Sequence, residues 1–193
     1  MATFSVRTPA KINLGLRILG HESKRHLLDT VLYAIPLYDH LTFTLIPPSN
    51  ALVSMALTAL TSETVSVSAE RPSLTRSAVE ISTTGPFGYL TPTDDTNVVS
   101  KILAKYSDCN WQVQIDKQIP VAAGLAGGTA DAAAAILALL EYEFVNEREA
   151  IEIAETEGSD LAFCYQALRH GLPYAALGTH FGEVLQQIST ELQ

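Results

Sequence analysis

Cysteine is scarce in this sequence, which has only Cys109 and Cys164 among its 193 residues and no C-x-x-C pair. This pattern argues against a disulfide framework or a zinc site and favours two free thiols in a reducing compartment. Long hydrophobic runs are also missing, because the uncharged stretches 51–62 and 132–140 are too short to span a bilayer. The N-terminal residues lack the apolar stretch of a signal peptide. We therefore expect a soluble, cytoplasmic protein.

Basic residues are few as well. The sequence contains 12 Lys and Arg against 21 Asp and Glu, which gives a formal net charge of −9. Nucleic acids and anionic membranes are bound by basic surfaces, so we expect neither as a partner. His40, His170 and His180 lack the spacing of metal ligands, and no metal site is predicted. Hydrophobic residues make up 47% of the chain, enough for the core of one substantial domain.

Alternation of apolar and polar residues predicts strands over the segments 11–18, 41–45 and 111–115. In the first segment the apolar side chains at even positions are expected to face the core, so Lys11 and Asn13 share the opposite face. The region 49–95 is rich in Ser and Thr and less regular. It predicts long loops with weak strands at 65–69 and 79–82.

Helical periodicity predicts helices over 97–106, 130–143 and 146–158, and a short helix that begins at Asp160. Asp95 and Thr96 are candidate N-caps of the first helix, and Ser159 is a candidate N-cap of the last. Asn146 and Glu149 have the spacing of a capping box. The second helix is apolar almost all round, which predicts that it is buried. The mixed order of strands and helices indicates an α+β fold.

The clearest chemical signal is the glycine-rich loop, Pro120-Val121-Ala122-Ala123-Gly124-Leu125-Ala126-Gly127-Gly128-Thr129-Ala130, which leads from a strand into the predicted buried helix. Glycines let a backbone approach a ligand closely, and a helix N-terminus attracts phosphate groups. Thr129 is a candidate to cap the helix, to bind a phosphate or to contact Mg²⁺. The segment matches neither the P-loop nor the dinucleotide fingerprint, and on glycine content alone a plain strand-to-helix turn explains it equally well.

This loop stands between two further motifs, Pro9-Ala10-Lys11-Ile12-Asn13-Leu14 and Gly158-Ser159-Asp160. In this order, the three motifs resemble those of the GHMP kinase superfamily, which includes galactokinase, homoserine kinase and mevalonate kinase. His26 and the segment 37–44 are similar to one branch of that superfamily. That branch uses ATP to phosphorylate a hydroxyl of 4-diphosphocytidyl-2-C-methyl-D-erythritol in non-mevalonate isoprenoid biosynthesis.

The resemblance implies a ribosomal protein S5 domain 2-like fold, with a mixed sheet and helices on one side. It also implies that residues 1–158 form an N-terminal ATP-binding domain and that residues 159–193 begin an incomplete C-terminal domain. ATP and Mg²⁺ would bind at residues 120–130, and the partner would be a small-molecule substrate. No oligomeric state follows from the sequence.

The resemblance further implies roles for four residues. Asp160 would accept or orient the proton of the substrate hydroxyl, and Lys11 beside it would steady charge on the transferred phosphoryl group. Asn13 would contact the substrate, and His26 would face its cytosine group. Taken without the resemblance, Lys11 and Asn13 are typical of an exposed strand face, Asp160 of a helix cap and His26 of a surface loop. Asn97 either caps a helix or corresponds to a recurring asparagine of the family.

The sequence also departs from the family pattern. Ala130 replaces a second hydroxyl residue after the glycines, and Ala162 replaces a proline after Asp160. Family members continue past residue 193 with a C-terminal domain. Two other interpretations therefore stay open: a nucleotide-binding module without catalytic activity, and a structural or interaction domain without a ligand.

Overall fold

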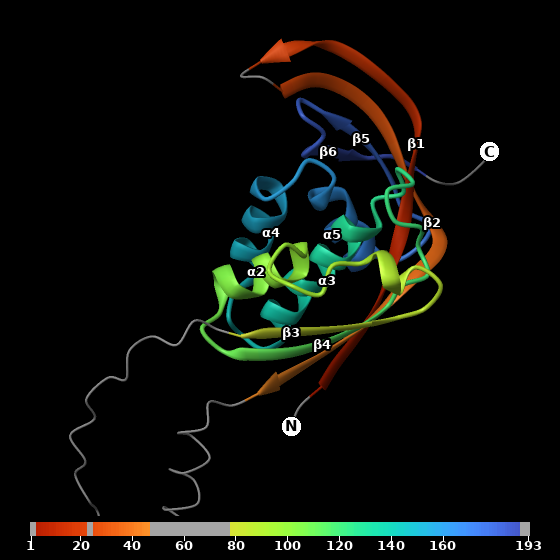
Figure 1. The fold of residues 1–193 in the computed structure, drawn as a ribbon. Coiled ribbons are helices and arrows are strands. Elements are labelled where there is room, and N and C mark those ends of the chain that lie inside the picture. Colours follow the sequence, from red (N-terminus) through yellow and green to blue (C-terminus); the bar gives the residue numbers. More distant parts are fainter. Residues whose placement is uncertain (1–2, 23–24, 47–77, 190–193) are drawn as a thin grey trace, which may run out of the picture.

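The computed structural model describes residues 3–22, 25–46 and 78–189, which form one mixed sheet with helices on one side of it (Figure 1). The elements in chain order are β1 (Thr3–Glu22), β2 (Arg25–Ile46), β3 (Val79–Thr84), the 3-10 helix η1 (Gly88–Leu90), α2 (Val98–Tyr106), β4 (Asn110–Asp116), α3 (Gly127–Glu141), α4 (Glu147–Thr156), α5 (Leu161–His170), β5 (Ala175–Thr179) and β6 (Val184–Gln187). The strand order is β3-β4-β2-β5-β6, and β1 pairs with β2. Only the β3–β4 pair is parallel among the described strands. The predicted α+β fold with a mixed sheet is confirmed.

Helix α3 lies at the centre of the core, as its apolar composition predicts. Every residue from Ala130 to Ile136 is buried. The alanine side chains are short, so α2, α5 and β1 pack closely against the helix. On the sheet side, the core contains Phe43 and Trp111, whose rings meet edge to face at 6.5 Å.

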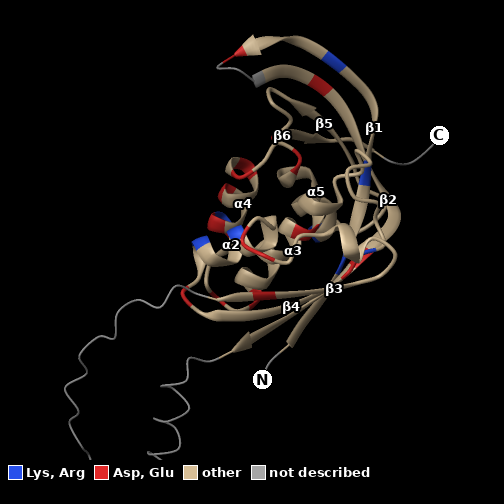
Figure 2. Ribbon diagram, viewed as in Figure 1, with Lys and Arg blue, Asp and Glu red and all other residues tan. Residues whose placement is uncertain are grey.

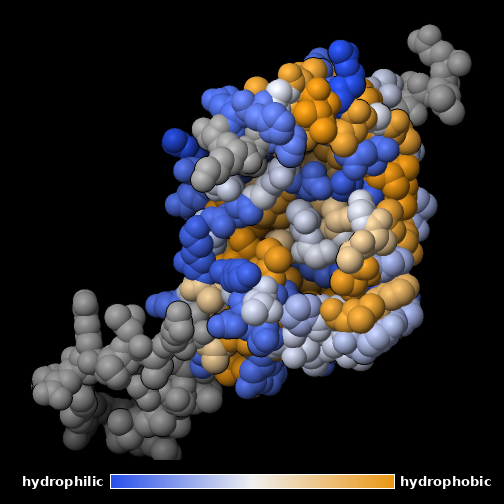
Figure 3. Space-filling model, turned by 45° about the horizontal axis from the view of Figure 1, so that its top comes forward, coloured by the Kyte–Doolittle hydropathy of each residue, from blue (hydrophilic) through white to orange (hydrophobic). Residues whose placement is uncertain are grey.

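Strands β1 and β2 are much longer than predicted and form one continuous hairpin, from the pair Thr3 and Thr44 to the pair Glu22 and Arg25. Its outer half extends beyond the helices (Figure 1) and carries charged residues of both signs (Figure 2). The expectation that the even-numbered apolar residues of segment 11–18 face the core was wrong. Leu14, Leu16, Ile18 and also Leu19 are more than half exposed. Hydrophobic residues are visible along the side formed by β1 and β2 (Figure 3).

Two features explain this error. The pairing register shifts between Asn13 and Gly15, where Leu14 has no paired residue on β2. Alternation also indicates which side chains share a face, but not whether another element packs on that face.

Three helix starts differ from the predictions. Helix α2 is capped by Asn97, whose side chain accepts a hydrogen bond from the N–H of Val99, and not by Asp95 or Thr96, so the capping role considered for Asn97 is confirmed. Helix α3 begins at Gly127, earlier than residue 130, because the end of the glycine-rich loop already has helical geometry. The N-cap position of α5 is Asp160, not Ser159, and its side chain makes no capping hydrogen bond. The capping box of Asn146 and Glu149 on α4 is present as predicted.

The other predictions from the sequence concern the strands of the sheet and the division into domains. Strand β3 includes the predicted segment 79–82, whereas the predicted strand 65–69 lies outside the described residues. Strands β5 and β6 are not predicted by the sequence analysis. The division after residue 158 stays a prediction: α5 and β5 follow it, and they contact α3 and β2. Within the described ranges, the helices are too short or too polar to cross a membrane.

Candidate active site

The glycine-rich loop forms one wall of a cavity of about 440 Å³, here called the loop cavity. Lys11 from β1 and Asp160 from the start of α5 reach the same cavity. Asn97 and Val98, at the start of α2, and Val121 line it as well. All three sequence motifs thus meet in one place, although they are distant in the chain.

Lys11 and Asp160 form an ion pair in this cavity, with 3.0 Å between Nζ and Oδ2. The Lys11 side chain is only 7% exposed, whereas the Asp160 side chain is 36% exposed. Lys11 is therefore not a solvated lysine on an open strand face. Because the Asp160 carboxylate makes no capping bond to α5, it is directed to Lys11 and the cavity rather than to the helix.

A chain of hydrogen bonds orients the Lys11 ammonium. Lys11 Nζ donates to Asn13 Oδ1 at 2.7 Å, and Asn13 Nδ2 donates to Thr30 Oγ1 at 2.7 Å. Thr30 Oγ1 in turn donates to the carbonyl oxygen of Gly15 at 2.9 Å. Asn13 itself does not line the loop cavity. Sequence reasoning missed Thr30, because only the register of the β1–β2 hairpin brings it beside Asn13.

The glycine-rich loop adopts an unusual backbone. Two of its alanines, Ala122 and Ala126, have positive φ angles of 59° and 56°, a conformation that costs about 1–3 kcal/mol for a non-glycine residue. The backbone N–H of Lys11 donates to the carbonyl oxygen of Leu125 at 3.0 Å and so ties the loop to β1. Such strain persists only where surrounding contacts fix the chain.

The loop ends in an open helix N-terminus. The N-cap residue Ala126 offers no side-chain acceptor, and the first helical hydrogen bond runs from the N–H of Ala130 to the carbonyl oxygen of Ala126. The preceding N–H groups of Gly127, Gly128 and Thr129 therefore lack acceptors within the helix. These three residues line the loop cavity, so the helix dipole and free N–H groups favour an anion there.

Residues of the loop differ in what they face. The ten residues from Pro120 to Thr129 all line the cavity, whereas Ala130 is fully buried in the core and does not. The hydroxyl expected from the family at position 130 would point away from the cavity in this structure. Thr129 lies within the first turn of α3 and does not occupy the N-cap position, so its role as a helix cap was wrong.

A buried charge cluster lies beneath the loop. Lys117 Nζ contacts Asp39 Oδ2 and Asp131 Oδ2, each at 2.5 Å. Thr8 Oγ1 donates to Asp131 Oδ1 at 3.3 Å. Burial, with the Asp39 carboxylate, raises the pKa of Asp131 to about 7 against the opposing effect of Lys117. No pattern in the sequence identifies Lys117 or Asp39 as functional.

The structure does not bring His26 to the loop cavity. His26 is exposed near the tip of the β1–β2 hairpin, where it pairs with His21 across the two strands. The two imidazole rings are 4.3 Å apart. The cytosine contact expected for His26 stays a prediction.

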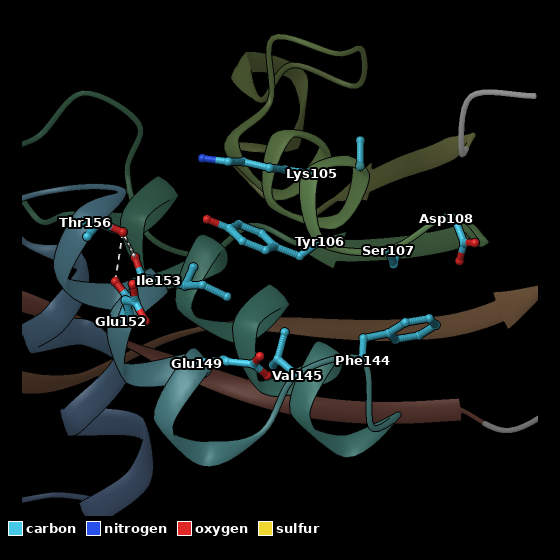
Figure 4. Close-up of a pocket in the computed structure, with 11 residues that line it drawn as sticks. Lys105, Tyr106, Ser107, Asp108, Phe144, Val145, Glu149, Glu152, Ile153 and Thr156 are labelled. Carbon is cyan, nitrogen blue, oxygen red and sulfur yellow. Dashed lines mark hydrogen bonds between the residues drawn. The ribbon is translucent and has the colours of Figure 1, made fainter. Parts of the chain in front are cut away.

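A second cavity, of about 740 Å³, lies between the end of α2 and helix α4 (Figure 4). Lys105, Tyr106, Glu149 and Glu152 line it, and it shares no lining residue with the loop cavity. No residue of the three motifs reaches it. In neither cavity, nor elsewhere in the described ranges, do three or more His, Cys, Asp or Glu side chains gather as metal ligands.

Comparison with known proteins adds independent findings. The family model of the GHMP kinases N terminal domain matches residues 96–167. The 4-diphosphocytidyl-2-C-methyl-D-erythritol kinase of Bifidobacterium adolescentis is 32% identical over 193 residues, covering 97% of this chain and 54% of the relative. The enzyme of the same name from Thermoanaerobacter sp. (strain X514) is 33% identical over 174 residues, covering 86% and 49%.

Among solved structures, a 4-(cytidine 5'-diphospho)-2C-methyl-D-erythritol kinase has a TM-score of 0.64 and 23% identity. The similarity covers 96% of this chain and 55% of the solved one. The chain therefore spans about half the length of the relatives that it matches.

Proposed function

We propose that the chain belongs to the GHMP kinase superfamily and is the part of an ATP-dependent kinase that binds the nucleotide and supplies Lys11 and Asp160 to phosphoryl transfer. The observation that carries this proposal is the position of the Lys11–Asp160 ion pair in the same cavity as the glycine-rich loop. An acceptor hydroxyl beside Asp160 and a triphosphate at the loop would then be held within one small volume.

The chemistry of phosphoryl transfer suits these groups. Its transition state is loose, so catalysis depends mainly on positioning and on stabilising charge at the phosphoryl oxygens. The N–H groups at the start of α3 would hold the phosphates, and the Lys11 ammonium would stabilise charge on the transferred group. Asp160 would orient the acceptor hydroxyl and take up its proton.

Magnesium would enter with the nucleotide as part of the substrate. Mg²⁺ keeps several waters and needs only one or two protein ligands in addition to substrate phosphates. The Asp160 carboxylate and the Thr129 hydroxyl, which both line the loop cavity, are oxygen donors of the kind that it prefers.

We propose 4-diphosphocytidyl-2-C-methyl-D-erythritol as the acceptor, which would place the reaction in non-mevalonate isoprenoid biosynthesis. The two kinases named for this substrate support the assignment, at 32% and 33% identity. Asn13 and His26 are the proposed contacts on the substrate side. His26 lies on the far part of the hairpin, so only an extended substrate would reach from it to Asp160.

The test is ADP release from Mg·ATP by this chain, with and without the proposed acceptor, and with Asp160→Asn as the matched control. We expect release that depends on the acceptor and is lost in the control. Retained release in the control would contradict the role of Asp160.

A second candidate function is nucleotide binding without phosphoryl transfer. It is favoured by one observation, that Ala130 stands where the family pattern has a second hydroxyl residue, and its side chain is buried in the core and does not reach the loop cavity. Calorimetric binding of Mg·ADP without acceptor-dependent ADP release would support it, and absence of both would exclude both functions.

A further inference from the structure

We infer that the buried cluster of Lys117, Asp39 and Asp131 is a positioning device that clasps the base of the glycine-rich loop. Its consequence for nucleotide affinity rests on the proposed function, but the clasp itself is a property of the folded chain. The Lys11–Asp160 pair does not use these three residues, and no hydrogen bond joins the two groups in the described structure.

The geometry places the clasp at both ends of the loop. Lys117 directly follows β4, before the loop begins, and Asp131 lies near the start of α3, after the loop ends. The Lys117 ammonium contacts both carboxylates at 2.5 Å and so joins the two ends to each other and to Asp39 on β2. A single cation therefore closes the loop against the sheet.

Asp39 extends the clasp to the backbone. Its Oδ1 accepts hydrogen bonds from the N–H of Gln118 at 2.7 Å and from the N–H of Ile119 at 2.8 Å. These are the residues that lead into the loop. Each is held by a charge-assisted hydrogen bond, which fixes direction as well as distance.

Burial of the cluster supports a positioning role. Asp39, Lys117 and Asp131 are all at least 97% buried. Apolar side chains of similar size often stabilise a protein as well as a buried ion pair does, so stability alone gives little reason for three buried ionisable groups. The directional contacts provide a reason, because the loop above holds Ala122 and Ala126 in a strained backbone conformation.

The clasp also touches the anion-binding end of α3. A Cβ atom built on Gly127 would lie 3.0 Å from Lys117 Nζ, so the ammonium packs directly against the first residue of the helix. Movement of Lys117 would shift the N–H groups that face the loop cavity. Lys117 and Asp131 also line the loop cavity, whereas Asp39 does not, so the cluster lies directly behind the phosphate-binding groups and sets their position.

Hydrogen exchange on the ligand-free protein tests the clasp. Asp131→Ala cuts the contact to α3 but leaves Lys117 paired with Asp39, so the variant is expected to fold. The amides of Lys11 and Ala130, which are bonded to Leu125 and Ala126, should exchange about tenfold faster or more. Asp131→Asn is the matched control, because its amide oxygen still accepts from Lys117 and should keep exchange near the wild-type rate.

Two internal reporters separate a clasp from general destabilisation. The amides of Gln118 and Ile119 remain bonded to Asp39 and should keep most of their protection. The amide of Ala150 on α4, bonded to Asn146, should be unchanged. If Asp131→Ala does not fold, Thr8→Val removes only the donor to Asp131 and should accelerate exchange of Lys11 and Ala130 to a smaller extent.

The inference is overturned if Lys11 and Ala130 keep their wild-type exchange in the folded variants, or if α4 accelerates equally. Binding of Mg·ADP provides a second readout, with affinity expected to fall about tenfold for Asp131→Ala and to stay unchanged for Asp131→Asn. A wild-type chain that binds no nucleotide would refute the proposed function, whereas exchange at Lys11 and Ala130 would still decide the clasp.

Discussion

The two adjacent glycines at the start of α3 allow protein packing and ligand binding to be separated by one pair of substitutions. A Cβ atom at Gly127 would lie 2.9 Å from Cγ2 of Ile119 and 3.0 Å from Lys117 Nζ. A Cβ atom at Gly128 would meet no atom of the described structure within 4 Å. Gly127 is thus required by the protein itself, whereas packing does not explain Gly128.

The expected magnitudes follow from these distances. Gly127→Ala overpacks a buried position and should lower the free energy of unfolding by about 1–3 kcal/mol. Gly128→Ala should leave that free energy unchanged or raise it by up to about 1 kcal/mol, because alanine has the higher helix propensity. If a phosphate approaches the backbone at Gly128, the added methyl group should weaken nucleotide binding about tenfold or more.

Urea unfolding and calorimetric titration with Mg·ADP, performed on the same preparations, measure both quantities. Stability and nucleotide binding are expected to change in opposite directions in Gly128→Ala: the free energy of unfolding stays equal or rises, and the affinity for Mg·ADP falls. Wild-type affinity in Gly128→Ala would refute the placement of a phosphate at the start of α3. Wild-type stability in Gly127→Ala would refute the packing of Lys117 and Ile119 against the helix.

Three other predictions follow from the structure. Asp160→Asn should lower kcat about 100-fold or more in the acceptor-dependent assay while Mg·ADP affinity stays near wild type, and equal losses in both would contradict its role. Because the pKa of Asp131 is raised from 3.8 to about 7, the native state retains a proton that the unfolded chain loses between these values. Relative to Asp131→Asn, wild-type stability should therefore fall as pH rises from about 4 to about 7 and then level off; urea unfolding measures this, and a flat difference would contradict it. Asn146→Ala removes the capping box with Glu149 and should lower the free energy of unfolding by about 1 kcal/mol in the same assay.

The sequence predicts those parts of the fold that local patterns determine. The alanine-rich run of α3 is buried because it is apolar almost all round, and the capping box of α4 forms between residues three positions apart. The length of the β1–β2 hairpin was not predicted, because a strand that extends past the helices needs no buried face. Strands β5 and β6 are short and depend on pairing with β2 and with each other.

In the candidate site, too, the sequence predicts the residues that belong to local motifs and misses those that depend on tertiary contacts. Lys11, Asp160 and the loop were identified as types of residue in a recognisable order, and the structure brings them into one cavity. Thr30, Lys117 and Asp39 were missed, since each acts through partners that only the fold brings near: Asn13 across the hairpin for Thr30, and Asp131 beyond the loop for Lys117. A motif thus identifies groups that would contact a ligand. The groups that hold those residues in place become visible only through strand register and burial, which is why the clasp beneath the loop has no signature in the sequence.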